Sequence, residues 1–327
     1  MPVKMAHGHV VRMKDNIKVS APATLSNFGP GLNTFGMALE APRDIVELSL
    51  DTPSGFHIQM IENWKGPDAK PSASKNTIEG NPAAIGAFRV ASHFNEKLVF
   101  NLMLTKNVPM ERGLGGGSAA VAAGAFAMMK VLDRGMMEGD LVTLSSDALQ
   151  DLGTELNMSG VAASLFGGFI VASSYKKTLT IAKIMTPDIH IALVMPKVNA
   201  KLEMFHKVVP AQLHQHEAAS NVGRAALIIH ALHKGDMKTV CHNLADQVAF
   251  PERMKLIPGF KEVKGAGEGA GALGVSISGT GPAVFGICMT EDAAKDALKA
   301  MIGAFKDNQV ESEGFVTRPG HGAMVIE

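Results

Sequence analysis

The stretch Gly113-Leu114-Gly115-Gly116-Gly117-Ser118-Ala119-Ala120 decides the fold, because it joins a glycine turn directly to an apolar segment that continues to Leu132. That segment is rich in Ala, Val, Phe and Met, so it predicts a buried helix. Successive glycines let backbone N–H groups approach an anion closely, and the helix that follows points its positive end toward the anion. We therefore predict a phosphate loop over residues 113–118, in which a side chain at Gly116 or Gly117 would fill the space that the phosphates need.

Two well-known phosphate-binding patterns do not fit this loop. A Walker A loop needs a Lys-Ser or Lys-Thr pair after its last glycine, and Ser118-Ala119 stands there instead. A dinucleotide-binding turn needs an acidic residue after the next strand, and that residue is absent. The structural alternative is a glycine turn that only lets the helix pack closely, so the flanking sequence has to decide.

Short strands and helices flank the loop on both sides in no regular order. Periodicity predicts strands at 18–21, 44–50, 98–104, 169–171, 191–195, 275–278 and 284–287, and helices at 81–94, 118–132 and 140–156. The turn between the last two strands is Gly279-Thr280-Gly281-Pro282, and the glycine-rich segment 265–271 is expected to be a mobile surface loop. The pattern indicates an α+β fold, not a regular βαβ repeat.

Composition argues against several classes of protein. Lys+Arg and Asp+Glu both number 31, so no net positive field is available to hold nucleic acid. Cys241 and Cys288 are the two cysteines, without Cys-x-x-Cys spacing, which argues against a disulfide scaffold or thiolate metal site and favours a reducing compartment. Residues 1–14 lack the apolar core of a secretory signal, and no apolar run approaches the roughly 18 to 20 residues that cross a bilayer. A cytoplasmic protein without membrane or nucleic-acid partners is expected.

The segment from Pro109 to Ala123 closely resembles the nucleotide-binding motif of the GHMP kinase superfamily, which includes homoserine kinase, mevalonate kinase and galactokinase. Three further stretches, 21–36, 246–260 and 276–285, resemble homoserine kinases and follow in the family order. Together the matches extend from residue 18 to the C-terminal end of the chain. The chain is therefore identified as similar to homoserine kinase.

This resemblance implies an α+β, two-domain GHMP-kinase fold. Residues 1–185 would form a ribosomal protein S5 domain 2-like N-terminal domain with the phosphate loop, and 186–327 a ferredoxin-like C-terminal domain. The implied reaction is phosphoryl transfer from ATP, with Mg²⁺, to the hydroxyl of a small alcohol. By analogy with the family, a homodimer is left open.

The resemblance also assigns roles to individual residues. Those matched to nucleotide binding are Asn76, Pro109, Arg112, Gly113, Leu114, Gly115, Gly116, Gly117, Ser118 and Ala119, with Lys106 as a further nearby positive charge. Those matched to the acceptor are Asn27, Asn33, Arg253, Gly279, Thr280 and Gly281. Ser118 and Glu155 are assigned to catalysis and to magnesium. Asp151 is the alternative carboxylate, because Asp151 and Glu155 lie four residues apart on a predicted helix.

The acceptor half departs from the family pattern. Asn33 stands where homoserine kinases have an aspartate, Met204 where they have an arginine, and 157–163 lacks the histidine, aspartate and proline of the family segment. Homoserine is still the leading acceptor. The alternatives are another small hydroxy acid, an isoprenoid alcohol, or a non-catalytic nucleotide-binding role. If Asn33 faces the ammonium group, Asn33→Asp should strengthen homoserine binding by roughly 1 to 3 kcal/mol.

Overall fold

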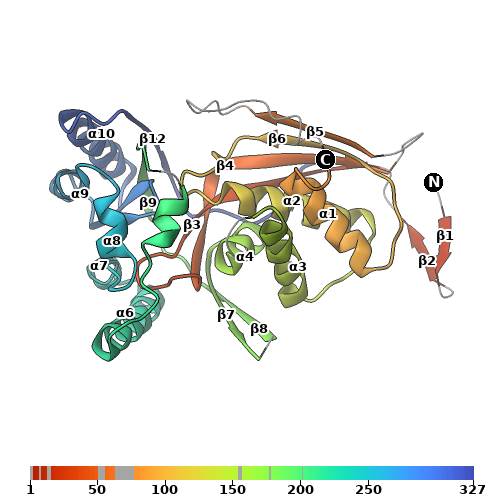
Figure 1. Ribbon diagram of the computed structural model, residues 1–327, viewed down its shortest axis with the longest axis horizontal. Helices are drawn as coiled ribbons and strands as arrows, with labels where there is room; N and C mark the ends of the chain where they lie inside the picture. The colour runs from red at the N-terminus through yellow and green to blue at the C-terminus, as the bar shows by residue number, and fades with distance from the viewer. Residues whose placement is uncertain are drawn as a thin grey trace.

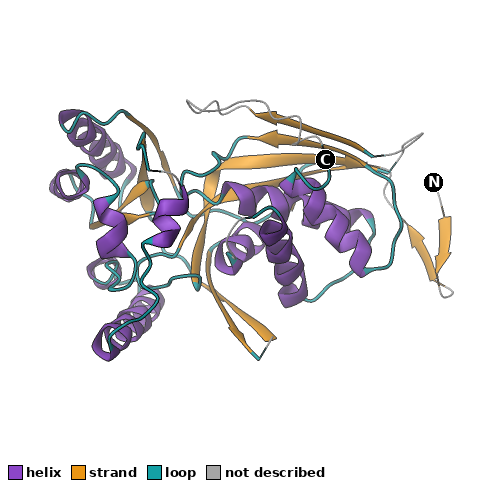
Figure 2. Cartoon of the chain, in the orientation of Figure 1, coloured by secondary structure: helices purple, strands orange, loops and turns teal. Residues whose placement is uncertain are grey.

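The computed structural model describes residues 3–6, 9–12, 16–50, 56–62, 77–153, 157–176, 178–200 and 202–327. This part of the chain forms two helix-covered sheets that lie side by side, with the N-terminal hairpin β1 (Val3–Ala6) and β2 (His9–Arg12) at one end (Figures 1 and 2). None of its helices is long and apolar enough to cross a membrane.

The larger sheet holds the N-terminal half of the chain. Its strands run in the order β13-β3-β4-β6-β5, with β7 attached to β4 and β8 attached to β7, and the β5–β6 pair is parallel whereas the other pairs are antiparallel. The strand bounds are β3 Asn16–Ser26, β4 Phe35–Ser49, β5 His57–Glu62, β6 Asn101–Lys106, β7 Phe169–Tyr175, β8 Thr178–Ile184 and β13 Met324–Val325.

Four helices cover one face of this sheet (Figure 1): α1 Pro82–His93, α2 Gly116–Val131, α3 Glu138–Asp151 and α4 Met158–Phe166. Alternate residues of β6 point toward these helices, so Leu102 and Leu104 enter the core, and Lys106 follows them on the same side. The strand pattern therefore carries a lysine into the interior beside the start of α2.

The smaller sheet is antiparallel, in the order β10-β11-β9-β12, with bounds β10 Gly274–Ile277, β11 Val284–Cys288, β9 His190–Pro196 and β12 Ser312–Thr317. Helices α9 (Phe260–Gly269) and α10 (Glu291–Asp307) bury their apolar sides against one face. The opposite face packs on α6 (Gln215–Lys234) and α7 (Met237–His242). The short helices α5 (Leu202–Lys207) and α8 (Phe250–Lys255) lie in the connections.

Phe28 joins the two sheets into one apolar core. Its ring stands edge-on to Phe169 of β7 at 5.2 Å between centroids and stacks on Phe285 of β11 at 5.5 Å. Through these two contacts of Phe28, both halves of the chain hold the turn after β3.

The end of the chain also returns to the larger sheet, where β13 pairs with β3. Arg43 donates there to the carbonyls of His321 and Gly322 at 2.9 and 2.6 Å.

Most predicted elements are present, with shifted ends, and two expectations are wrong. The glycine-rich segment 265–271 is not a surface loop, because α9 continues to Gly269 with Val263 and Gly267 buried, and a Cβ on Gly267 would come within 2.9 Å of Met301. The helix predicted over 140–156 ends at Asp151. The division into domains at residue 185 remains a prediction.

Candidate active site

The predicted phosphate loop, residues 113–118, runs directly into the N-terminal end of α2 and keeps this name below for its predicted role. Gly115 is the helix cap, with the left-handed φ of 65° that glycine adopts without strain, and the helix begins at Gly116. Gly116 and Gly117 thus belong to the first turn, not to the preceding loop as predicted. Backbone N–H groups of a first turn have no partner within their own helix. Those of residues 116–118 are therefore suited to bind an anion.

The glycines of this turn are crowded to different degrees. A Cβ on Gly116 would lie 2.4 Å from the carbonyl oxygen of Pro109, whereas a Cβ on Gly117 would meet only Leu149 Cδ2, at 3.1 Å. We predicted that a side chain at either position would fill the space of the phosphates, and the structure gives a different reason for each glycine. Gly116 is required by the close approach of the preceding backbone, and Gly117 faces the tip of one side chain.

Hydrogen bonds connect the end of β3 with two glycine turns that are far apart in the sequence. The Thr24 amide donates to Leu114 O at 2.9 Å, and the Ser278 hydroxyl donates to Gly113 O at 2.5 Å. The Gly279 amide donates to Ser26 O at 2.9 Å, which closes the triangle. The structure therefore brings together the turn after β3, the phosphate loop and the β10–β11 turn.

A buried ion pair that the sequence analysis did not assign lies beneath this loop. Lys106 pairs with Asp44 and donates to Gly116 O at 2.8 Å, and the two side chains are 3% and 0% exposed. Burial raises the pKa of the Asp44 carboxyl, and Lys106 with two backbone amides offsets part of that increase. Lys106 therefore points into the core under the loop. The sequence contains one sign that Asp44 is buried, because it alternates in step with the apolar residues Val46 and Leu48 of β4.

Arg112 and Ser118 remain at the loop itself. Arg112 is half-buried and its guanidinium lies 3.5 Å from Pro196 O, which links the loop to β9. Ser118 is 3% exposed in the first turn of α2. Among residues 113–118, Ser118 is the residue whose side chain carries an oxygen atom.

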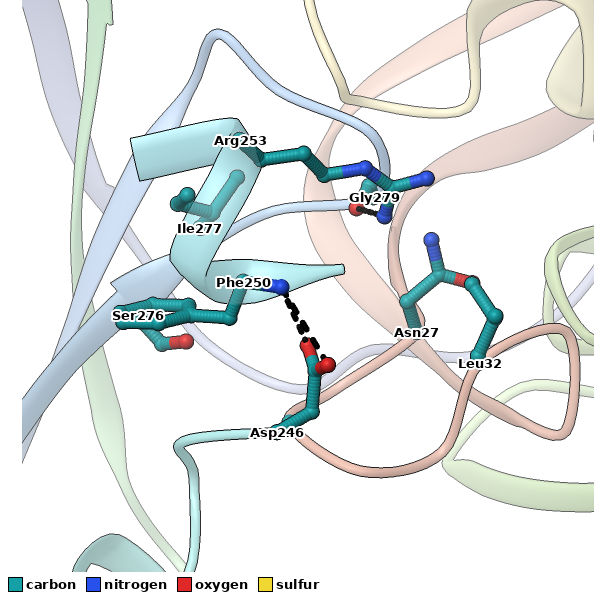
Figure 3. A pocket seen from close by; sticks show the side chains of 9 residues that line it. Asn27, Leu32, Asp246, Phe250, Arg253, Ser276, Ile277 and Gly279 are labelled. Carbon is teal, nitrogen blue, oxygen red and sulfur yellow. Dashed lines mark hydrogen bonds between the residues drawn. The ribbon is translucent and has the colours of Figure 1, made fainter. Parts of the chain in front are cut away.

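A narrow cavity adjoins the β10–β11 turn. It is lined by Asn27, Gly29, Leu32, Asp246, Phe250, Arg253, Ser276, Ile277 and Gly279. Figure 3 shows the side chains of Arg253, Asp246 and Asn27 converging on this space from α8, from the segment before α8 and from the turn after β3. Asp246 and Arg253 are the two charged residues among those that line it.

Both charged side chains of the cavity are fixed by the backbone. Arg253, 4% exposed, donates from Nε to Phe205 O at 3.1 Å and from a terminal nitrogen to Gly279 O at 3.4 Å. Asp246, 9% exposed, accepts the amides of Val248 and Ala249 at 2.6 Å each. The cavity therefore presents one held positive and one held negative charge. Sequence analysis found the arginine but assigned no role to Asp246.

The structure separates the predicted acceptor residues into two groups. Asn27, Arg253 and Gly279 line the cavity, whereas Thr280 and Gly281 belong to the same turn outside the lining. Asn33 is exposed, and its backbone amide, not its side chain, bonds to Asn27 Oδ1 at 2.9 Å. The residue expected to face the ammonium group therefore lies outside the cavity.

Of the predicted nucleotide and metal residues, two fall outside the structural description and a third lies at the surface. Asn76 and Glu155 lie outside the described residues. Asp151 ends α3 at the surface and forms an ion pair with Arg89, its side chain 40% exposed. Within the described ranges, no group of three or more His, Cys, Asp or Glu side chains is placed to hold a metal ion.

The exposure of Asn33 predicts almost no effect of Asn33→Asp, whereas the sequence predicted stronger binding of homoserine. Because its side chain lies outside the cavity, Asn33→Asp should change the KM for homoserine by less than about threefold. Steady-state kinetics of the purified variant measures this. A tenfold or larger improvement would show that residue 33 reaches the acceptor after all.

Comparison with known proteins agrees with this geometry. Residues 84–168 match the family model of the GHMP kinases N-terminal domain, and residues 228–307 match that of the GHMP kinases C-terminal domain. The chain is 32% identical to homoserine kinase from Pyrococcus abyssi over 94% of its length and 98% of the relative's. It is 33% identical to homoserine kinase from Pyrococcus furiosus, over 94% and 99% of the two lengths.

Among solved structures, the crystal structure of homoserine kinase from Cytophaga hutchinsonii superposes with a TM-score of 0.86 at 30% identity, covering 96% of this chain and 98% of that one. The two-domain α+β fold predicted from the motifs is thereby confirmed. The chain belongs to the homoserine kinase family of the GHMP kinases, and it is an ATP-dependent small-molecule kinase.

Proposed function

We propose that this kinase transfers the γ-phosphoryl group of ATP to the side-chain hydroxyl of homoserine, giving O-phosphohomoserine and ADP. The family membership supports this acceptor. The observation that carries it is the cavity beside the phosphate loop, in which a fixed arginine and a fixed aspartate are the charged groups of the lining.

The charges of this cavity match those of an α-amino acid. Moving an ammonium or carboxylate group out of water is strongly unfavourable unless an opposite charge or several hydrogen bonds compensate it. Arg253 offers its guanidinium to the carboxylate, and Asp246 offers a carboxylate to the ammonium group. Asp246 would thus supply the negative charge that the sequence pattern lacks at Asn33. This pairing favours homoserine over alcohols that carry only a carboxylate.

The acceptor cavity is physically connected to the phosphate loop through two consecutive residues. Ser278 donates to Gly113 O in the loop, and Gly279 accepts from Arg253 in the cavity. In the proposed transfer, the hydroxyl oxygen forms a bond to the γ-phosphorus and the bond from that phosphorus to the β–γ bridging oxygen breaks. The hydroxyl proton leaves to solvent or to a phosphate oxygen. The first-turn amides of α2 would orient the phosphates and stabilise their charge.

Magnesium is part of the same proposal. The Ser118 hydroxyl, buried in the first turn of α2, is an oxygen of the kind that Mg²⁺ accepts, and Glu155 is proposed as its carboxylate. When bound with ATP, the ion neutralises phosphate charge. The placement of Asp151 in an ion pair with Arg89 favours Glu155 over Asp151 for this role.

An acceptor screen tests the proposed function. ADP formation should be measured with homoserine, threonine, shikimate, pantoate and mevalonate at saturating ATP and Mg²⁺. We expect kcat/KM for homoserine to exceed that for each acceptor without an ammonium group by at least about 100-fold, because Asp246 would otherwise stay buried without its counter-charge. Threonine controls for the position of the hydroxyl. Faster turnover of mevalonate or pantoate, or nucleotide binding without turnover of any acceptor, would contradict the proposal.

A further inference from the structure

The Asp44–Lys106 pair touches both ends of the segment that carries the phosphate loop. Asp44 Oδ1 accepts the backbone amides of Asn107 and Val108 at 2.8 Å each, at the point where β6 leaves the sheet. The other carboxylate oxygen pairs with Lys106, whose ammonium group donates to Gly116 O at 2.8 Å. One buried pair therefore binds the chain before the loop and the first residue of α2.

We propose that the Asp44–Lys106 pair is a positioning device that holds the phosphate loop in its nucleotide-binding shape before ATP arrives. In this proposal its charges do not touch the nucleotide, because both side chains lie in the core below the loop and are at most 3% exposed. The pair acts through backbone groups: two amides at the start of the segment and one carbonyl at its end. The proposal rests on this loop being the ATP site and is independent of the choice of acceptor.

The physical reason for a charged device is the length of the connection. Between Val108 and Gly116 the chain contains two glycines and one proline, apart from these end residues, and the flexible glycines make ordering of the segment entropically unfavourable. Charge-assisted hydrogen bonds are stronger than neutral ones and directional, so they fix both ends in a defined geometry. A loop held in this way loses less conformational freedom when the phosphates bind.

The Lys106–Gly116 contact also constrains the direction of α2. The carbonyl that accepts from Lys106 belongs to the residue that opens the helix, immediately after its cap at Gly115. A shift of that carbonyl also moves the N–H group of Gly117 in the first turn, because the two groups belong to the same peptide unit. The same peptide also lies against Pro109 O, where a Cβ on Gly116 would approach to 2.4 Å. The pair and the glycine therefore fix the same part of the loop from two sides.

Three variants and a matched control test the proposal: Asp44→Asn, Lys106→Met, the double variant, and Glu291→Gln. Glu291→Gln removes one partner of an exposed ion pair with Lys295 on α10, which packs against the smaller sheet. We expect both single variants to raise the Kd for ADP and the KM for ATP at least about tenfold, with the KM for homoserine changed less than about threefold. The control should bind ADP like the unmodified enzyme.

The double variant separates positioning from stability. Asp44→Asn with Lys106→Met leaves no unpaired charge in the core, so its melting temperature should recover relative to Lys106→Met alone. Its ADP affinity should stay weakened, since the bond to Gly116 O is still missing. Recovery of both melting temperature and ADP affinity would overturn the proposal, as would unchanged ADP affinity in folded single variants.

Hydrogen exchange of the unmodified enzyme keeps the proposal testable if the variants do not fold. The amides of Asn107 and Val108 should exchange slowly without nucleotide, and ADP should slow them by less than about threefold. If these two amides exchange freely in the absence of ADP and become protected only on its addition, the pair does not hold the loop and the proposal fails.

Discussion

Replacing Gly116 by alanine should weaken ADP binding by at least about 100-fold, because the first turn of α2 has no room for a side chain at this position. The new Cβ would lie 2.4 Å from Pro109 O and 3.1 Å from the Met110 sulfur. A backbone oxygen at that distance does not yield as a side-chain tip does, so the turn or the loop has to move. Displacing catalytic or binding groups by about 1 Å is enough to cost about two orders of magnitude.

Gly117→Ala is the matched control for this prediction. The same methyl group is added one residue later in the same helix turn, where it would meet only Leu149 Cδ2 at 3.1 Å. That contact is relieved by a small side-chain rotation, and alanine is the better helix former. ADP affinity should therefore stay within about threefold. Calorimetric titration of both variants, with circular dichroism to confirm folding, decides the matter. Equal losses at the two positions would instead indicate that both glycines face the phosphates.

The sequence predicted the glycine-rich turn and the helix that follows it correctly because their signals are local, whereas the phosphate-binding role of the turn stays a prediction. Glycine density, an apolar continuation and the order of family-like motifs do not depend on how the chain is packed. The β10–β11 turn was predicted for the same reason, since Gly279 and Gly281 stand between two short apolar runs. What local patterns do not contain is the hydrogen bonding of this turn to Gly113, 165 residues away in sequence.

The interior charges show the limit of this approach. An aspartate within a strand is usually interpreted as facing solvent, and the burial of Asp44 depends on Lys106, which lies 62 residues further along the chain. The prediction for residues 265–271 was wrong, because a segment expected at the surface is part of a packed helix. Its glycines suggested a loop, but tertiary contact with α10 makes small residues favourable on the buried side of α9. In both places long-range packing overrides a local preference.

The acceptor site shows a third limit, which concerns the transfer of a role by alignment, and the role transferred to residue 33 stays a prediction. Asn33 occupies the family's aspartate position, yet its exposed side chain lies outside the cavity that contains Asp246. Sequence order alone does not reveal that a carboxylate from the segment before α8 lies opposite the turn after β3. The charge balance of the cavity was therefore recoverable only from the three-dimensional arrangement.

Arg253→Met should lower kcat/KM for homoserine by about 100- to 1,000-fold while leaving the Kd for ADP within about threefold. Removing one partner of a buried, hydrogen-bonded charge pair costs about 2 to 5 kcal/mol, because the remaining charge is left without compensation. Here that remaining charge is the carboxylate of the acceptor. Arg253→Lys should recover only part of the loss, since an ammonium group cannot reproduce the planar fork that also reaches Phe205 O and Gly279 O. Arg318→Met, at an exposed arginine paired with Asp188, is the control and should leave both constants unchanged.

Asp246→Asn removes the other charged group of the cavity. The carbonyl oxygen of an asparagine accepts hydrogen bonds as a carboxylate oxygen does, so the bonds to the amides of Val248 and Ala249 can be kept while the charge is removed. Kinetics of this variant should therefore show a loss for homoserine and almost none for an acceptor that carries only a carboxylate. That selectivity is what an ammonium-binding role requires, because a defect in the turn before α8 would displace Arg253 and weaken every carboxylate-bearing acceptor alike. Equal losses for both kinds of acceptor would assign Asp246 to the support of the arginine and remove it from recognition of the substrate.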